Sequence, residues 1–266
     1  MTYEFLRKYF EDTEFNSIKK EKELFKINYI NILQLYNDLV NLKEDEKELP
    51  IKEEYWNNKN KWFIMIKDNY EAAIIGCHGS GKTTLCDKLS RFYKLYPEDS
   101  INYFMGKNPF LSEMKIILNY SKINDKLEYE KVPFVSDRHG LTSILIYAKS
   151  FKELGWIDDK QYNIINHTIN NSDVDWVFPK KFLYVNETLE TIKEYISIRN
   201  RQGLKEEDNI YLVSVLRNYK NFSRKDLDFE LLNKSLQEEI NSIPIKRINS
   251  NTNLETIINS ISPTSL

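Results

Sequence analysis

Residues 76–84 read GCHGSGKTT and fit the pattern G-x-x-x-x-G-K-[ST] of a phosphate-binding loop without a mismatch. The glycines let the backbone turn tightly and point successive N–H groups at phosphate oxygens, Lys82 adds a positive charge, and the Thr83 hydroxyl can ligate Mg²⁺. A short apolar run precedes the loop and apolar residues at helical spacing follow it, so a strand, the loop and a helix N-terminus together form an anion site. The pattern therefore predicts a site for a nucleoside triphosphate, formed by Gly76, His78, Gly79, Ser80, Gly81, Lys82, Thr83 and Thr84.

Charge and composition set limits on the class of protein. A formal charge of -2 over 266 residues gives no global reason to expect a nucleic-acid-binding protein. The chain has only two cysteines, Cys77 and Cys86, so we expect no structural disulfide and a reducing compartment. No apolar run approaches membrane-spanning length, and the N-terminal MTYEFLRKYFED is unlike a signal peptide. We therefore expect a soluble, cytoplasmic protein without a membrane partner.

The chain divides into a helical N-terminal extension, residues 1–60, and a main domain, residues 61–266. The extension is charged, aromatic and free of glycine, and an apolar stripe of 3.6-residue period over residues 25–40 predicts a long amphipathic helix. We expect it to pack on the main domain, with a partner-binding arm as the alternative. Residues 62–66 are compatible with an extra strand or with a buried helical turn.

From Tyr70 onward, apolar runs alternate with helical patterns, which predicts an α/β fold with a five-stranded parallel sheet covered by helices on both faces. The expected strands are 71–75, 101–104, 133–136, 182–185 and 245–248. The expected helices are 82–96, 109–120, 141–154, 159–170, 188–199, 210–222, 228–242 and 254–261. Ligands in such sheets bind at the carboxyl ends of the strands.

The run VPFVSDRH at residues 132–139 is the second motif. An apolar strand delivers Asp137 at its end, where a protein with a phosphate-binding loop needs a carboxylate for Mg²⁺. Arg138 beside it could hold a phosphate or the acceptor. The alternative is local: Asp137 caps the next helix and Arg138 pairs nearby.

The third motif is RNRQG at residues 199–203, which ends a helix with two arginines, Arg199 and Arg201, and a glycine. Phosphoryl transfer spreads negative charge over the moving group, and arginines that close over it stabilise that charge. Ordinary helix termination also favours cations and a glycine at this place.

The order of these three motifs resembles the deoxynucleoside kinase and thymidylate kinase superfamily of P-loop kinases. Some of its members, including herpesviral thymidine kinases, carry Asp-Arg-His at the equivalent strand end. The segment FLYVNETLETI at residues 182–192 is similar to the family's strand and lid helix, and the PIKRINSN of residues 244–251 resembles its last strand and base-contacting loop. The resemblance spans residues 70–262 and leaves the N-terminal extension unexplained.

The resemblance implies a phosphotransferase that uses ATP and Mg²⁺ and acts on a nucleoside or a nucleoside monophosphate. Lys82 would bind phosphates, and Thr83 and Asp137 would ligate Mg²⁺. The phosphoryl group would be neutralised by Arg138, Arg199 and Arg201. The resemblance also assigns Asn249 and Asn251 to ATP binding. His139, beside Arg138, could contact the acceptor, with packing or helix capping as the alternative, and the aromatic residues Tyr103, Phe104 and Phe110 flank the expected acceptor pocket, where they could stack on a base.

One departure concerns the base that takes the proton from the acceptor. These kinases usually carry a Glu-Pro pair after the second strand, whose Glu serves nucleoside phosphorylation, but YFMGKNPF at residues 103–110 has no carboxylate. A nucleoside hydroxyl benefits from a positioned base, whereas a monophosphate is already an anion. Glu98, Asp99 or Asp137 would have to substitute, and Asp137 is the preferred substitute.

Three other functions remain open at the level of sequence. The acceptor could be a hydroxyl of nucleic acid, ATP hydrolysis could drive a switch protein, or the chain could be a nucleotide-binding subunit without catalysis. We expect the small-molecule kinase and leave a homodimer open.

Overall fold

The computed structural model describes residues 65–66, 68–97, 108–128, 130–171, 176–199, 208–226, 232 and 234–261. The predicted N-terminal extension, the predicted strand 101–104 and three predicted site residues, Tyr103, Phe104 and Arg201, lie outside these residues.

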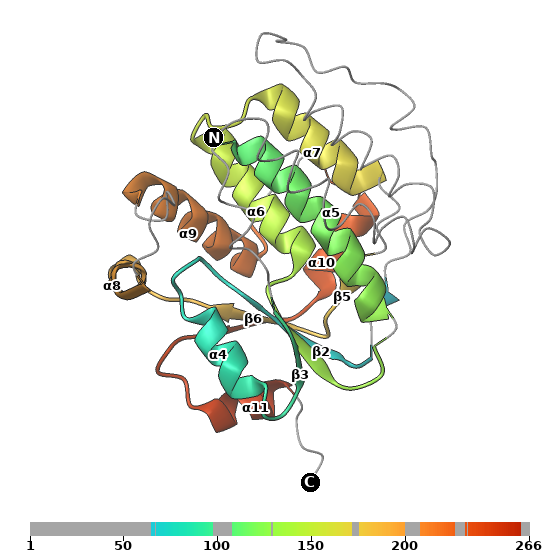
Figure 1. Ribbon diagram of the computed structural model, residues 1–266, viewed down its shortest axis with the longest axis vertical. Helices are drawn as coiled ribbons and strands as arrows, with labels where there is room; N and C mark the ends of the chain where they lie inside the picture. Colours follow the sequence, from blue (N-terminus) through green and yellow to red (C-terminus); the bar gives the residue numbers. More distant parts are fainter. Residues whose placement is uncertain are drawn as a thin grey trace, which may run out of the picture.

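A five-stranded sheet forms the centre of the molecule, with the strand order β3-β4-β2-β6-β7 and parallel pairing throughout (Figure 1). This confirms the predicted fold class. The strands are β2 (Tyr70–Ile75), β3 (Lys94–Tyr96), β4 (Phe134–Asp137), β6 (Phe182–Val185) and β7 (Ile245–Ile248). A separate parallel pair joins β1 (Met65–Ile66) to β5 (Val177–Phe178), so the last two residues of the segment 62–66 form a strand.

Helices cover both faces of the sheet. In Figure 1, α4 (Lys82–Leu89) and α11 (Leu254–Ile261) lie below it, and the larger helical layer lies above it. The helices of that layer are α5 (Pro109–Glu128), α6 (Gly140–Glu153), α7 (Asp159–Asn171), α9 (Asn209–Arg224) and α10 (Lys234–Ser242). The remaining helix, α8 (Leu189–Arg199), buries Ile192 and Ile196 in the core of the larger layer.

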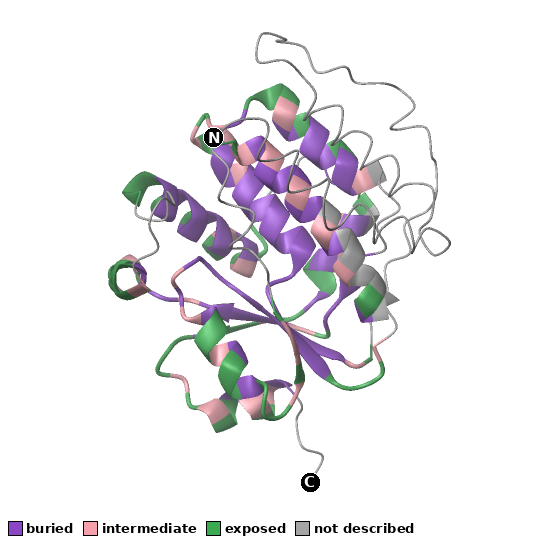
Figure 2. Cartoon of the chain, viewed as in Figure 1, coloured by how far each residue is buried: buried purple, intermediate pink, exposed green. Residues whose placement is uncertain are grey.

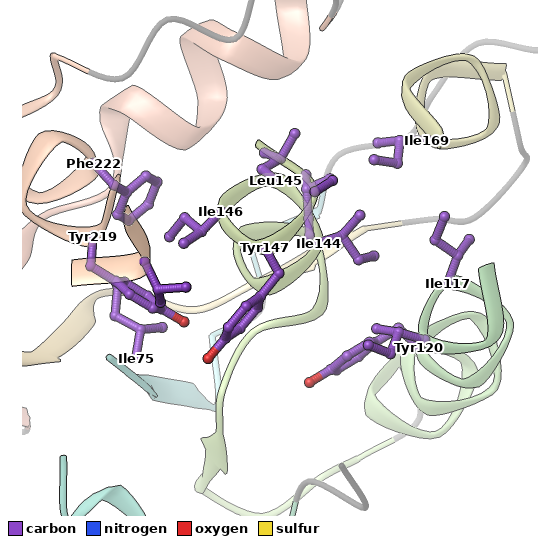
Figure 3. Close-up of a cluster of buried hydrophobic side chains, with 14 of the residues drawn as sticks. Ile75, Ile117, Tyr120, Ile144, Leu145, Ile146, Tyr147, Ile169, Tyr219 and Phe222 are labelled. Carbon is purple, nitrogen blue, oxygen red and sulfur yellow. The ribbon is translucent and has the colours of Figure 1, made fainter. Parts of the chain in front are cut away.

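The two cores follow from the alternation of side chains along a strand. All six residues of β2 are buried (Figure 2); Ala73 and Ile75 pack in the larger core, and Ala72 and Ile74 pack in the smaller one. Figure 3 shows α6 at the centre of the larger core, with Tyr219 and Phe222 on one side of it and Ile117 and Tyr120 on the other. A strand buried on both faces is what a sheet between two helical layers requires.

The predicted helix 82–96 is wrong in its second half. The helix ends at Leu89, and Lys94–Tyr96 form the edge strand β3 beside β4. The apolar spacing continued past the true end, yet Phe92 is 56% exposed, while Leu95 packs in the smaller core. The Glu130 carboxylate receives hydrogen bonds from Lys94 Nζ and Tyr96 Oη, which ties the strand in place.

Two other helices differ from their predicted extents by more than two residues. Helix α5 continues to Glu128, eight residues beyond the predicted end at 120, and α10 begins at Lys234 in the described residues where the sequence predicted 228. None of the described helices is both long enough and apolar enough to cross a membrane.

Gly140 allows a close approach between α5 and α6. A Cβ added there would lie 2.3 Å from Cγ and 2.8 Å from Cβ of Tyr120, and the Tyr120 Cβ cannot move without shifting α5. We expect Gly140→Ala to lower the free energy of unfolding by about 1–3 kcal/mol, because the two helices must separate.

The control is Gly155→Ala, where the new Cβ meets nothing within 4 Å and only the left-handed backbone, φ 66°, disfavours it. Urea denaturation of both variants measures the difference. Gly155→Ala should lose about 1–2 kcal/mol from its backbone alone, and a loss for Gly140→Ala below about 1 kcal/mol would contradict the packing account.

Candidate active site

The loop between β2 and α4 lies at the carboxyl end of the central strand. Gly79 and Gly81 have φ values of 73° and 85°, in the left-handed region that favours glycine. Gly79 also lies directly under α8, because a Cβ there would come within 2.7 Å of Ile196 Cγ1 and 3.2 Å of the Ile192 carbonyl oxygen. Helix α8 therefore packs against the loop at Gly79, and the loop leads directly into the first turn of α4.

Lys82, the first residue of α4, is buried, and its Nζ donates a 2.6 Å hydrogen bond to the Cys77 carbonyl oxygen. The ammonium group thus lies across the loop. A phosphate oxygen is a stronger, charged acceptor than a carbonyl. The geometry fits a loop that surrounds phosphate with backbone amides and one lysine.

Thr83 and Asp137 meet beside the loop. Thr83 Oγ1 donates a 3.0 Å hydrogen bond to Asp137 Oδ2, and Asp137 Oδ1 is buried with no hydrogen-bond partner among the described residues. A buried carboxylate oxygen without a partner is costly unless a ligand satisfies it. A hydroxyl and a carboxylate are oxygen ligands of the kind that Mg²⁺ takes, so these residues fit the metal.

Arg138 follows with a backbone φ of 72°, one of two positive values at non-glycine residues of the described chain. This conformation costs about 1–2 kcal/mol in a residue with a Cβ. Its N–H donates to the Ile74 carbonyl oxygen at 2.8 Å, and its Nη1 contacts Tyr147 Oη at 2.7 Å and Tyr219 Oη at 3.2 Å. The guanidinium therefore lies between the sheet edge and two helices, α6 and α9. Tyr147 and Tyr219 are visible side by side in Figure 3.

A cavity of about 710 Å³ opens over the loop. Its lining includes residues 78–84, Arg138, Arg199 and residues of the loop between β7 and α11. The volume is typical of a site for a nucleotide-sized ligand. The structure thus brings together most of the predicted binding residues around one space.

The loop after β7 is built from short local hydrogen bonds. Thr252 Oγ1 donates to Asn249 Oδ1 at 3.1 Å, and the Ser250 N–H donates to the carboxylate of the buried Glu187. Asn249 lines the cavity, while Asn251 lies in the same turn and donates its N–H to Asn249 Oδ1 at 3.1 Å. The sequence did not predict Ser250, Thr252 and Leu254 as lining residues. Leu254 was missed because it belongs to the apolar pattern of α11.

His78 lines the cavity and is 7% exposed, with its ring stacked on Tyr211 at 5.1 Å between centroids and 18° between planes. Phe110, predicted to contact the acceptor, is buried in the larger core at the start of α5.

His139 lies among aromatic residues and not on the wall of the large cavity. Its Nε2 lies 3.1 Å from the Val177 carbonyl oxygen, and its ring is 4.9 Å from that of Phe178. Burial lowers the pKa of His139 from 6.5 to about 4. The side chain therefore remains neutral at physiological pH.

Comparisons with known proteins identify relatives. A family model described as "Deoxynucleoside kinase" matches residues 72–262. Deoxyadenosine kinase of Dictyostelium discoideum is 26% identical over 190 residues, covering 66% of this chain and 71% of that protein. Two solved structures of deoxyadenosine kinase from M. mycoides are 20% identical, each covering 72% of this chain and 98% of its own. The one with the products dCMP and a flexible dCDP has a TM-score of 0.58, and the one with bound dCTP has 0.56. The solved structures share the fold.

The low pKa of His139 makes stability depend on pH. The unfolded chain binds a proton at this residue below pH 6.5 and the folded chain only below about 4, so the stabilisation present above 6.5 is lost as pH falls toward 4. We expect the loss at this one residue to reach about 3 kcal/mol.

The difference in free energy of unfolding between wild type and His139→Phe measures this effect. It should change between pH 6.5 and 4 and be constant above 6.5. A difference independent of pH would refute the buried neutral histidine.

Proposed function

Because the chain belongs to the deoxynucleoside kinase family of P-loop kinases, we propose that it transfers the γ-phosphate of ATP, with Mg²⁺, to a sugar hydroxyl of a deoxynucleoside. The observation that carries this proposal is the Thr83–Asp137 pair beside a complete phosphate-binding loop, with one buried oxygen of Asp137 left for a ligand. The family match supports the deoxynucleoside as acceptor.

ATP would occupy the large cavity along its length. Its phosphates would lie against the loop amides and Lys82, and its base would extend toward the β7–α11 loop, where Asn249, Leu254 and Ile257 line the wall. Apolar side chains with a few polar groups suit the flat face and polar edge of a base.

Thr83 and Asp137 would hold Mg²⁺ beside the loop. When bound, the metal neutralises charge on the β- and γ-phosphate oxygens. Lys82 and Arg138 add fixed positive charge around the same oxygens, and Arg199 reaches the cavity from the end of α8. Charge placed in advance where negative charge develops lowers the barrier to transfer. The lid role of Arg201, which lies outside the described residues, stays a prediction from the family resemblance.

The observed position of the second strand, β3, suggests which residue takes the proton from the acceptor hydroxyl. The residues that follow β3 in the sequence are Pro97 and Glu98, so a carboxylate does stand after the second strand of the sheet. Tyr96 pairs with Ser136, the residue before Asp137, and carboxyl ends of parallel neighbours meet at one edge. Glu98 itself lies outside the described residues, and its position in the chain supports the role.

We therefore assign the base to Glu98 and the metal to Asp137, in place of the preference for Asp137 as base. The oxygen Oδ2 of Asp137 already accepts the Thr83 hydroxyl, which suits a metal ligand. A base after the second strand also favours a neutral hydroxyl as the acceptor over a monophosphate.

The direct test offers labelled ATP to the purified protein with deoxyadenosine, other deoxynucleosides, deoxynucleoside monophosphates and DNA in parallel. Deoxyadenosine is the first choice because the relatives above carry that name. We expect labelled deoxynucleoside monophosphate. Lys82→Ala should lower the rate about 10²- to 10³-fold, and Lys193→Ala, on the exposed face of α8, should leave it unchanged.

If the label were transferred only to the deoxynucleoside monophosphates or only to DNA, the proposed deoxynucleoside acceptor would be wrong. ATP consumed at the same rate without any acceptor would replace the kinase by a hydrolase.

The assignment of the base makes a separate prediction. Glu98→Gln should lower kcat about 10²- to 10⁴-fold, because the acceptor hydroxyl loses its proton acceptor, with little effect on the KM for ATP. The neighbouring Asp99→Asn should leave kcat near that of wild type. A large loss in Asp99→Asn, with Glu98→Gln active, would move the base to Asp99.

A further inference from the structure

The turn that carries Arg138 is short. Strand β4 ends at Asp137 and helix α6 begins at Gly140, so the chain reverses through Arg138, with φ 72°, and His139, with φ -123°. The direction in which the Arg138 side chain leaves the backbone depends on this left-handed conformation. An unfavourable conformation persists only when the surroundings hold it.

Two buried hydroxyl groups lead to the Arg138 carbonyl, one bonded to it directly and one bonded to the first. Ser136 Oγ donates a 2.6 Å hydrogen bond to the Arg138 carbonyl oxygen. Tyr70 Oη is hydrogen-bonded to Ser136 Oγ, and because the serine proton is already engaged, the tyrosine donates. The bonds form a chain from Tyr70 through Ser136 to Arg138, in which each bond polarises the next.

Tyr70 is itself fixed. It is 1% exposed, and its ring stacks on Phe134 with centroids 4.5 Å apart. It begins β2, the strand that ends in the phosphate-binding loop, while Ser136 belongs to β4. The hydroxyl pair therefore joins the two strands whose ends form the site.

We propose that Tyr70 and Ser136 are positioning residues that hold the left-handed turn at Arg138 and so keep its guanidinium on the cavity wall beside the loop. Arg138 lines the cavity, and its Nη1 lies 3.4 Å from the Gly76 carbonyl oxygen. This inference rests on the proposed function, in which Arg138 neutralises the transferring phosphoryl group. Neither hydroxyl lines the large cavity, so both act through Arg138.

The kinetic test compares three single variants. Ser136→Ala should lower kcat about tenfold, since a charge displaced by about 1 Å loses much of its effect. Tyr70→Phe should lower it about threefold, because the serine keeps its own bond to the carbonyl. In both, the KM for ATP should change by less than about twofold.

Ser150→Ala is the matched control. Ser150 is also fully buried, donates to a carbonyl oxygen, that of Ile146, at 2.8 Å, and accepts a side-chain donor, Asn218 Nδ2, at 2.9 Å. It lies in the last turns of α6, away from the cavity, so kcat should remain that of wild type. A drop in kcat as large as that of Ser136→Ala would show a loss of stability and overturn the inference.

A double variant tests whether the pair acts through Arg138. In an Arg138→Ala background, adding Ser136→Ala should not lower kcat further, whereas independent effects would multiply and contradict the proposal. Should Ser136→Ala fail to fold, the same comparison with Tyr70→Phe serves.

A crystal structure of Ser136→Ala, or of Tyr70→Phe, tests the positioning role without relying on enzyme activity. We expect the guanidinium to have left the Gly76 carbonyl oxygen and Tyr147 Oη, and an unchanged Arg138 would overturn the proposal. A wild type that phosphorylates no deoxynucleoside would instead refute the proposed function, and the crystal structure would still decide the positioning role.

Discussion

The hydrogen bond between Thr83 and Asp137 joins the two parts of the chain on which the site depends. One partner lies in the first turn of the helix after the phosphate-binding loop, and the other ends the neighbouring strand. Their meeting follows from the register of the sheet, in which Ile74, near the end of β2, pairs with Asp137 at the end of β4. A shift by one residue would turn the Asp137 side chain to the opposite face. The packing of β2 and β4 in both cores therefore determines whether a carboxylate stands beside the loop.

The same sheet edge explains why the other functional groups come from distant parts of the sequence. The loop follows β2, Asp137 ends β4 and Arg138 follows it, and Glu187, after β6, binds the turn that follows β7. Because all five strands are parallel, their carboxyl ends share one edge, and the helices that return the chain stay on the faces. Helix α8 packs on Gly79 and brings Arg199 over the cavity. Among the described residues, the proposed catalytic groups thus lie on or next to the strands and helices of the sheet.

Much of this arrangement could be predicted from local patterns. The glycine pattern predicted the conformation of the phosphate-binding loop. The apolar runs 182–185 and 245–248 predicted β6 and β7 with the bounds that the structure shows. The edge strand β3 could not be found this way, because Leu95 and Tyr96 continue the helical spacing of α4 and the bonds from Lys94 and Tyr96 to Glu130 are distant in sequence. Because β3 was not predicted, Glu98 was not recognised as the carboxylate that follows the second strand. The roles of Ser136 and Tyr70 were equally invisible, since they arise from a contact across 66 residues.

The central claim is that Asp137 holds the metal at the phosphates of ATP. Calorimetry with a non-hydrolysable ATP analogue, with and without Mg²⁺, measures this on wild type and Asp137→Asn. The account predicts that Mg²⁺ tightens binding of the analogue to the wild type and does not do so in the variant. The same gain from Mg²⁺ in both proteins would contradict it.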